Sequence, residues 1–419
     1  MRLSFPTLIS EAHFRLLEGH EIVATIAQMY LHPSTLRTVC EILDLPGGGG
    51  KCHMANVATW ADRERMKMRW SGPLHYANAV DDFPSKTCAF PGTQGWAGSK
   101  GGNVLDAIKN VTGVLEDWVG HDASDGAANE ALKFLIHFMG DMHQPLHLAG
   151  RERGGNGIPV LFDRRHTSEF FYSFWFSWFG LLNFWWNVDL HSVWDNFMLA
   201  KSVRNVPRNY TRPLPYPQVE RALKGTIYDP FIRHIMWEGV LNPWAEEIDS
   251  WLDCPAPEAV QANPQRTGGL FVLQDALKGF SRGVVRMMTG GGVEISPDGE
   301  VACPYAWAKP IHPLNCEIIW PKELDDPKVY VTRVGGGGDE HNHDHSHEEE
   351  LEDVGALIPP PPDGKNWIQL DTPEYAGVVA KRMILERLLA QGGIRLAGLL
   401  NYLFADEEPL VKSLAPVLR

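Results

Sequence analysis

Hydrophobic residues recur every three or four positions in four stretches of the chain. The stretches are residues 19–31, 103–118, 127–138 and 378–400, and their spacing is that of a helix with one apolar face. The sequence therefore predicts an all-α, mostly helical protein, with further helices after Asp195 that Trp and Pro residues interrupt. Gly392 and Gly393 fall inside the last stretch. Each costs about 1 kcal/mol in a helix interior, so we predict a break there.

Two stretches with unusual composition interrupt this pattern. Residues 170–186 are seventeen uncharged residues, eleven of them aromatic. This run is shorter than the about 20 apolar residues of a membrane span and is poor in aliphatic residues. Residues 335–362 contain runs of Gly and Pro around a His-rich acidic tract. We interpret this second stretch as a disordered linker, with weak metal scavenging by its histidines as the alternative.

Charge and cysteine content narrow the class of protein. The chain has 419 residues and a net charge of −14, which argues against a broad basic groove for duplex DNA. Six Cys form an even number and permit three disulfides, as in proteins of oxidising compartments. Asn110 and Asn209 begin sequons for N-glycosylation. Residues 1–14 lack a convincing secretory signal, so either the protein is not secreted or this N-terminus is not the natural one. We expect the second case, in which the protein is extracellular.

The candidate chemistry lies in two His-x-x-x-Asp pairs. His137 and Asp141 lie four residues apart and share one helix face, as do His191 and Asp195. We expect Pro145 to end the first helix and His147 to follow from the turn. Imidazole and carboxylate groups are ligands of zinc, and buried carboxylates need a cation partner. The alternative for each pair is an exposed surface pair, but the apolar neighbours favour a multinuclear metal site.

These residues belong to an ordered series of motifs that resembles the S1/P1 nuclease family. Family members are secreted, mostly helical, zinc-dependent enzymes that cut single-stranded nucleic acid to 5′-nucleotides. The motifs extend with gaps over residues 19–403, which we take as one nuclease-like domain after an N-terminal extension (1–18) and before a tail (404–419). In chain order they are Gly19-His20, Trp60-Ala-Asp62, Leu74-His75-Tyr76, His137-Phe-Met-Gly-Asp141, His143-Gln-Pro-Leu-His147, Gly154-Gly-Asn156 and His191-Ser-Val-Trp-Asp195.

The resemblance implies three zinc ions. The first would be bound by Asp62, His75, His137 and Asp141. Asp141 would bridge to a second zinc that also binds His20. The third would be bound by His147, His191 and Asp195. Zinc-activated hydroxide would attack the phosphorus, so the predicted catalytic residues are Asp62, Asp141 and Arg65.

The resemblance also assigns substrate contacts and disulfides. Arg65 would contact the scissile phosphate, with a solvated helix charge as its alternative. Tyr76 would stack on a base and Asn78 would bond its edge, with Gly155 and Asn156 opposite. The expected substrates are single-stranded DNA, RNA and nucleotides, and the expected protein is a monomer without a stable protein partner. His143 is interpreted as structural. The implied disulfides are Cys40–Cys52, Cys88–Cys316 and Cys254–Cys303.

Two departures from the family pattern keep alternatives open. Family members begin with a tryptophan whose amine and carbonyl bind the zinc of His20, and Arg15 stands in that place. Relative to the family, residues from about 168 to 189 form an insertion. We interpret this insertion as an intron read as coding sequence. An exposed aromatic loop or a membrane tether are the alternatives for this insertion. For the whole chain, the alternatives are a zinc phospholipase C and a metal-binding relative without catalysis.

Overall fold

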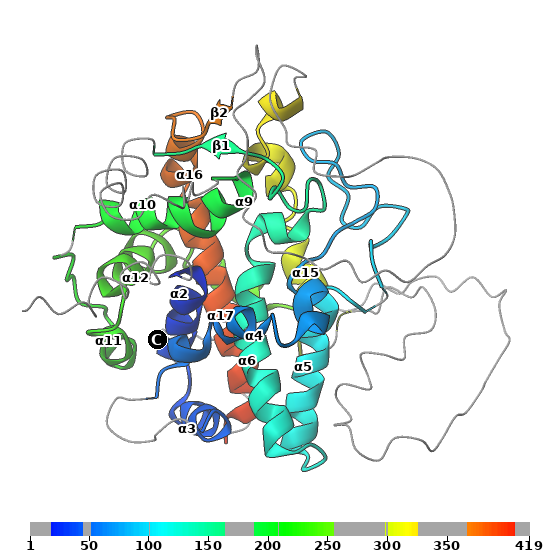
Figure 1. Ribbon diagram of the computed structural model, residues 1–419. Helices are drawn as coiled ribbons and strands as arrows, with labels where there is room; N and C mark the ends of the chain where they lie inside the picture. Colours follow the sequence, from blue (N-terminus) through cyan, green and yellow to red (C-terminus); the bar gives the residue numbers. More distant parts are fainter. Residues whose placement is uncertain are drawn as a thin grey trace, which may run out of the picture.

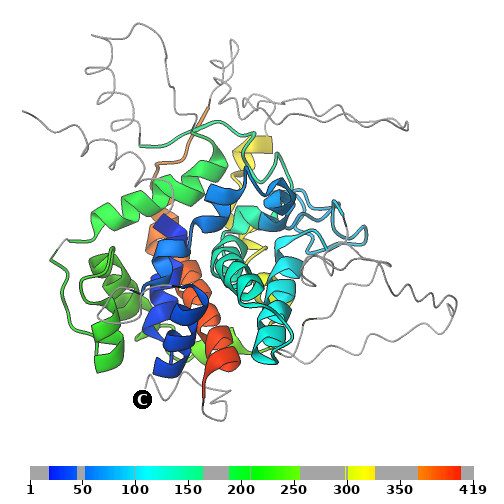
Figure 2. The same ribbon diagram turned by 60° about the horizontal axis from the view of Figure 1, so that its bottom comes forward.

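A single helix, α17 (Ile384–Phe404), runs through the centre of the computed structural model (Figure 1). It packs between α2 (Glu18–Met29) and α6 (Asp125–Met142), and Figure 2 shows these helices side by side with α5 (Val104–Val119). Most α17 side chains are buried, so the helix lies in the core instead of covering it with one apolar face. The structure describes residues 18–44, 52–99, 101–163, 188–207, 209–254, 298, 301–325 and 367–406.

Shorter helices surround this centre. They are, in chain order, α3 (Pro33–Ile42), η1 (Met54–Val57), α4 (Trp60–Glu64), η2 (Arg69–His75), η3 (Pro145–Leu148), α9 (Leu190–Ser192), η4 (Val193–Phe197), α10 (Met198–Asn205), α11 (Pro217–Leu223), α12 (Asp229–Ile235), η5 (Met236–Val240), α13 (Ile248–Leu252), α15 (Pro304–Ala308), η6 (Asn315–Ile319), η7 (Lys322–Asp325) and α16 (Ala376–Lys381).

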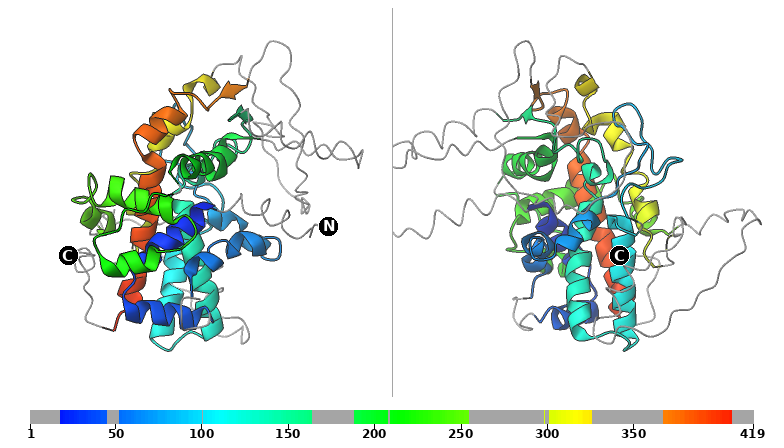
Figure 3. Two further views of the ribbon diagram at one scale, coloured as in Figure 1. Left: turned by 90° about the vertical axis from the view of Figure 1, so that its left-hand side faces the viewer. Right: turned by 45° about the vertical axis from the view of Figure 1, so that its right-hand side comes forward.

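One small parallel sheet joins distant parts of the chain. Strand β1 (Val160–Leu161) pairs with β2 (Ile368–Gln369), with Val160 opposite Ile368. The two strands and α16 lie at one end of the molecule, and α3 lies at the other (Figure 3). Apart from these four strand residues, the regular elements of the described ranges are helical. The predicted all-α fold class is therefore confirmed.

The predicted helices exist, with shifted ends. The stretch predicted from Gly19 forms α2 from Glu18, and residues 103–118 form α5, whose first turn is capped by the Asn103 side chain. Helix α6 begins after its cap Ser124 and continues to Met142, beyond the predicted end of its periodic stretch. It ends before Pro145, which instead begins the 3₁₀ turn that contains His147.

The predicted break at Gly392 and Gly393 is wrong. The helix is continuous there, and the chain breaks earlier at Met383, whose φ is +50° between α16 and α17. A Cβ on Gly393 would lie 2.5 Å from Cγ2 of Ile26, and one on Gly392 would lie 3.3 Å from Val23. The glycines let α2 pack closely against α17, and this tertiary packing outweighs their low helix propensity.

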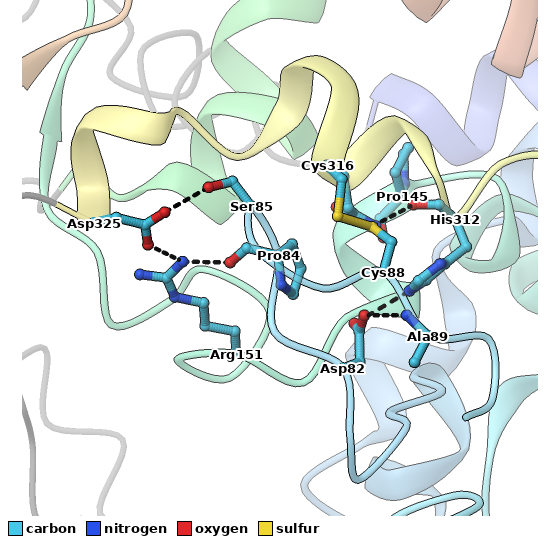
Figure 4. Close-up of a disulfide and its surroundings, with 11 residues drawn as sticks. Asp82, Pro84, Ser85, Cys88, Ala89, Pro145, Arg151, His312, Cys316 and Asp325 are labelled. Carbon is cyan, nitrogen blue, oxygen red and sulfur yellow. Dashed lines mark hydrogen bonds and ion pairs between the residues drawn. A yellow bond between two sulfur atoms is a disulfide. The ribbon is translucent and has the colours of Figure 1, made fainter. Parts of the chain in front are cut away.

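Three disulfides link segments within the described residues. They join Cys40 to Cys52, Cys88 to Cys316 and Cys254 to Cys303, which are the pairs that the resemblance implies. Figure 4 shows the second bond, which ties the loop that contains Cys88 to η6. Beside it, the buried Asp82 carboxylate lies 3.1 Å from His312 Nε2, and its other oxygen accepts from the Ala89 N–H at 2.9 Å.

The remaining sequence expectations are placed as follows. Asn209 is exposed, whereas Asn110 is half-buried within α5. No helix in the described ranges is long and apolar enough to cross a bilayer. Arg15, residues 168–187 of the insertion and the linker 335–362 lie outside the described residues. Val188 and Asp189, which we assigned to the insertion, belong to the fold, since Val188 accepts from Val160 N and Asp189 caps α9.

A buried arginine holds α11 and α12 together, and its loss should be costly. Arg233 is 3% exposed and donates to Asp229 at 2.9 Å and to Glu220 at 2.5 Å. Arg233→Met removes the ion-pair partner that both carboxylates share, so we expect the free energy of unfolding at pH 7 to fall by roughly 3 kcal/mol. Chemical denaturation measures this, with the exposed Arg221→Met as control.

The pH dependence of this loss follows from Glu220. Burial alone would raise the pKa of Glu220, but hydrogen bonds from Arg233 and the Leu214 N–H lower it below its usual 4.5. A depressed folded pKa contributes stability above the unfolded pKa, and this contribution is lost as the pH falls through the folded value. The difference between wild type and Arg233→Met should therefore shrink below about pH 4.5. A constant difference down to pH 3 would contradict the assignment.

Candidate metal centre

A cavity of about 280 Å³ collects side chains from segments far apart in the sequence. Helix α2 supplies His20, α4 supplies Asp62, α6 supplies Asp141, and the turns η2 and η3 supply His75 and His147. The lining residues are Gly19, His20, Val23, Asp62, Arg65, His75, Tyr76, Gly140, Asp141, His143, Gln144, Pro145, His147, Asn156, His191, Trp194, Asp195, Leu199, Leu385, Leu388 and Leu389.

The first predicted ligand set is assembled at one wall of this cavity. His137 Nε2 lies 3.1 Å from His75 Nδ1, 3.6 Å from Asp62 Oδ1 and 3.3 Å from Asp141 Oδ2. His75 Nδ1 lies 2.9 Å from the same Asp141 oxygen and 3.9 Å from Asp62. Four ligands at 2.0–2.1 Å from a tetrahedral metal would be about 3.3 Å apart. These donor atoms fit a four-coordinate metal ion.

Asp141 uses its second oxygen toward other histidines. Its Oδ1 lies 3.5 Å from His20 Nε2 and 3.3 Å from His147 Nδ1. The carboxylate is 2% exposed, so its two oxygens face different donors inside the protein. This is the arrangement expected of a carboxylate that bridges two cations.

A third group of donors lies across the cavity. His191 Nε2 is 3.2 Å from Asp195 Oδ2, and His147 Nε2 is 3.8 Å from Asp195 Oδ1. The two imidazole rings are stacked, with centroids 4.9 Å apart. The structure therefore brings all eight predicted metal ligands into three groups around one cavity.

Backbone carbonyls orient three of the histidines. Nδ1 of His137 donates to Ala58 O, Nδ1 of His147 to His75 O and Nδ1 of His191 to Gly154 O, each at 2.8 Å. A carbonyl oxygen only accepts, so each Nδ1 carries the proton and each Nε2 is left as the donor atom for a metal. Such outer partners fix the tautomer and the ring orientation of metal-binding histidines. The sequence gives no sign of them.

The carboxylates make the centre strongly negative. Burial alone would lower the pKa of His137, but Asp141 and Asp62 raise it to about 9. Burial alone would also lower the pKa of His191, but Asp195 raises it to about 9. Burial dominates at His20 and lowers its pKa to about 4. Two histidines that hold protons this tightly sit in a potential that also favours a divalent cation.

Gly140 allows His20 to enter the cluster. The His20 ring stacks on His137 at a centroid distance of 4.0 Å. It therefore lies directly over α6, where a Cβ on Gly140 would be 2.3 Å from His20 Nδ1. The glycine between His137 and Asp141 is thus a steric requirement for the position of His20.

The predicted substrate residues are only partly in the cavity. Arg65, Tyr76 and Asn156 line it, and the Tyr76 ring lies 4.8 Å from the His147 ring. Asn78 does not line it. With the amide group oriented to satisfy its neighbours, the Asn78 nitrogen donates to Ala77 O and Ala149 O at 3.2 Å. Gly155 is also outside the lining, where its positive φ of 89° brings the backbone close to Leu190. Its N–H donates to Arg151 O at 3.2 Å and its carbonyl accepts from the Ile158 N–H at 3.1 Å, so its observed contacts hold the local turn.

Sequence reasoning missed several contributors. Gln144 donates to Asp195 Oδ1 at 2.8 Å and so orients a predicted ligand; its place in the motif of His143 and His147 was the available signal. The leucines of α17 form an apolar wall, with no signal in the sequence. His143, interpreted as structural, donates to Met139 O and accepts from the buried Arg395, which also binds the carbonyls of Trp251 and Trp307.

Comparison with known proteins gives the same family as the motifs. A family model described as S1/P1 Nuclease matches residues 17–263. Nuclease P1 of Penicillium citrinum is 34% identical over 261 residues, 60% of this chain and 85% of the relative. Nuclease S1 of Aspergillus oryzae is 30% identical over 54% of this chain and 73% of its own length. Endonuclease 2 of Arabidopsis thaliana is 29% identical over 57% of this chain and 68% of its own length. The match over more than half of the sequence shows that this chain belongs to the S1/P1 nuclease family.

Proposed function

We propose that this nuclease is a zinc-dependent endonuclease that hydrolyses single-stranded DNA and RNA to products with 5′-phosphates. The observation that supports this most directly is the meeting of three His and Asp donor groups at one cavity that also contains Arg65 and Tyr76. Mixed imidazole and carboxylate donors at tetrahedral spacing favour zinc. Dephosphorylation of 3′-mononucleotides by the same centre is part of the proposal.

Asp62, His75, His137 and Asp141 would hold one zinc, His20 and Asp141 a second, and His147, His191 and Asp195 a third. When bound, zinc supplies Lewis acidity and lowers the pKa of water so that it is a nucleophile near neutral pH. The carbonyls of Ala58, His75 and Gly154 keep the Nδ1 protons in place, so each Nε2 stays directed at the centre.

The remaining residues bind and orient the strand. Arg65 carries a permanent positive charge into the cavity, where it would bind the scissile phosphate and stabilise charge that builds up on its oxygens. Tyr76 is half-buried beside His147, and its ring offers a face for stacking on a base. A base in a duplex would have to leave its partner before it could stack on a protein ring, whereas an unpaired base is free to do so, which favours single strands over duplexes.

The cellular setting is proposed from the covalent structure. Three disulfides fit an oxidising compartment, so we infer that the protein is extracellular. That it acts as a monomer without a stable protein partner stays an expectation from the family resemblance. Glycosylation is expected at Asn209, which is exposed, before the half-buried Asn110.

Metal content and cleavage of the purified chain test the function together. We expect close to three zinc ions per chain by elemental analysis and rapid cleavage of a single strand over the same sequence as a duplex. A chelator should abolish cleavage, and zinc but not magnesium should restore it. Cleavage that survives complete zinc removal would contradict the proposal. So would hydrolysis of phosphatidylcholine vesicles with no action on the oligonucleotide, which is the outcome for a phospholipase C.

A further inference from the structure

A basic segment, residues 63–70, lies next to the centre and is held there at both ends. It begins directly after Asp62 and leads through η2 to His75, and both of these residues belong to the first donor group. Arg65 within it already lines the cavity. The segment contains four basic residues and one acidic residue, namely Arg63, Arg65, Lys67, Arg69 and Glu64.

The cations of this segment are largely free of protein partners. Lys67 pairs with Glu64 at 2.7 Å and is 76% exposed. Within the described part of the chain, no carboxylate lies within ion-pair distance of Arg63, Arg65 or Arg69, and all three are exposed. The charge of Arg63 does act on Glu21, whose pKa it lowers against the effect of burial. The chain as a whole carries a net charge of −14. A concentrated positive surface on an acidic protein, beside a centre for phosphodiester hydrolysis, is complementary to a polyanion.

An exposed aromatic ring accompanies these charges. Trp70 is 42% exposed, and its ring lies 5.8 Å from that of Phe134 on α6. Phe134 in turn packs edge-on against Trp60, over which Lys133 places its ammonium group at 5.1 Å. The Trp70 ring therefore packs against Phe134, while a large part of it faces solvent. Single-strand-binding proteins combine such rings with a positively charged track, because bases stack on the rings and phosphates follow the charges.

We propose that residues 63–70 bind the single strand beyond the nucleotide at the scissile bond, with Trp70 as a stacking surface and Arg69, Lys67 and Arg63 as phosphate contacts. This rests on the proposed function and extends it, since it makes strands of several nucleotides better substrates than a dinucleotide. Arg65 stays at the scissile phosphate. Trp70 and Arg69 act on binding of the flanking strand and leave the chemical step unchanged.

Two variants with matched controls test the proposal. Trp70→Ala removes the ring, and Tyr402→Ala removes an exposed aromatic ring at the far end of α17. Arg69→Ala removes a positive charge, and Arg37→Ala removes an exposed one from α3. Each zinc-loaded protein is assayed with a dinucleotide and with an oligothymidylate of about twelve nucleotides. Binding of a slowly cleaved phosphorothioate strand of the same length is measured by fluorescence anisotropy at several salt concentrations.

We expect Trp70→Ala to raise KM and the phosphorothioate Kd for the long strand about tenfold, with kcat/KM for the dinucleotide unchanged. Arg69→Ala should reduce the slope of log Kd against log salt by about 0.7, the value for one phosphate contact on a single strand. The controls should match wild type. Equal losses on both substrates, or an unchanged Kd, would overturn the proposal. Failure of the proposed function has a different signature: wild type then cleaves neither substrate, while the binding measurement still decides the role of residues 63–70.

Discussion

Replacing Asp141 by alanine is expected to remove bound zinc and to lower cleavage by about 10³-fold or more. Both oxygens of this carboxylate face donor groups: Oδ2 lies 2.9 Å from His75 Nδ1, and Oδ1 lies 3.5 Å from His20 Nε2. Among the described residues, no other carboxylate lies within ion-pair distance of both His75 and His20. Loss of the carboxylate would therefore remove a ligand from both of the proposed metal ions and would leave the histidines with less negative charge to offset their burial.

Elemental analysis and a cleavage assay on the same sample check this. Asp82→Asn is the matched control, because Asp82 is a buried aspartate beside a histidine but lies outside the cavity. It should lose stability yet keep its zinc and its kcat. If Asp141→Ala retained zinc and cleaved at the wild-type rate, the bridging role and the centre built on it would both be wrong.

Replacing Arg65 by alanine is expected to lower kcat/KM for a dinucleotide by about 10²–10³-fold. Arg65 lines the cavity, and no carboxylate of the described residues pairs with it, so its charge is available to a phosphate. Zinc content should stay unchanged, because guanidinium groups do not bind metals.

Two comparisons sharpen this second experiment. Arg63→Ala removes the same kind of charge two residues away and should leave the dinucleotide reaction unaltered. Arg65→Lys should recover only part of the activity, since an ammonium group cannot make the paired hydrogen bonds of a guanidinium. An Arg65→Ala enzyme with normal dinucleotide kinetics would support the solvated helix charge that the sequence left open.

The cluster of His and Asp side chains could be predicted from sequence because its signal is local and repeated. His137 and Asp141 share a helix face set among apolar residues, and the other ligands follow in the order of a recognisable family. The three carbonyls that orient the histidines could not be found this way. Ala58, His75 and Gly154 meet their partners only in the folded chain, and a carbonyl group is present in every residue.

The error at Gly392 and Gly393 has the same origin. Helix propensity describes an isolated helix, in which two adjacent glycines are unfavourable. In the fold, Ile26 and Val23 of α2 occupy the space that side chains at these positions would take. The actual break, at Met383, carries no Pro or Gly and depends on how α16 turns into the core. Periodicity thus predicts which segments are helical, whereas tertiary contacts decide where the chain bends.

Because α17 lies at the centre of the fold, the part of the chain that this nuclease needs extends beyond the residues that carry the predicted ligands. The family match ends at residue 263, and every predicted ligand lies before that point. Leu385, Leu388 and Leu389 nevertheless form a wall of the cavity, and α2, which carries His20, packs along α17. A fragment cut at the end of the match would retain all the donor atoms and lose the support on which their arrangement depends. The matched part of the sequence contains the predicted ligands, while the C-terminal helix, beyond the match, supports the positions that they take.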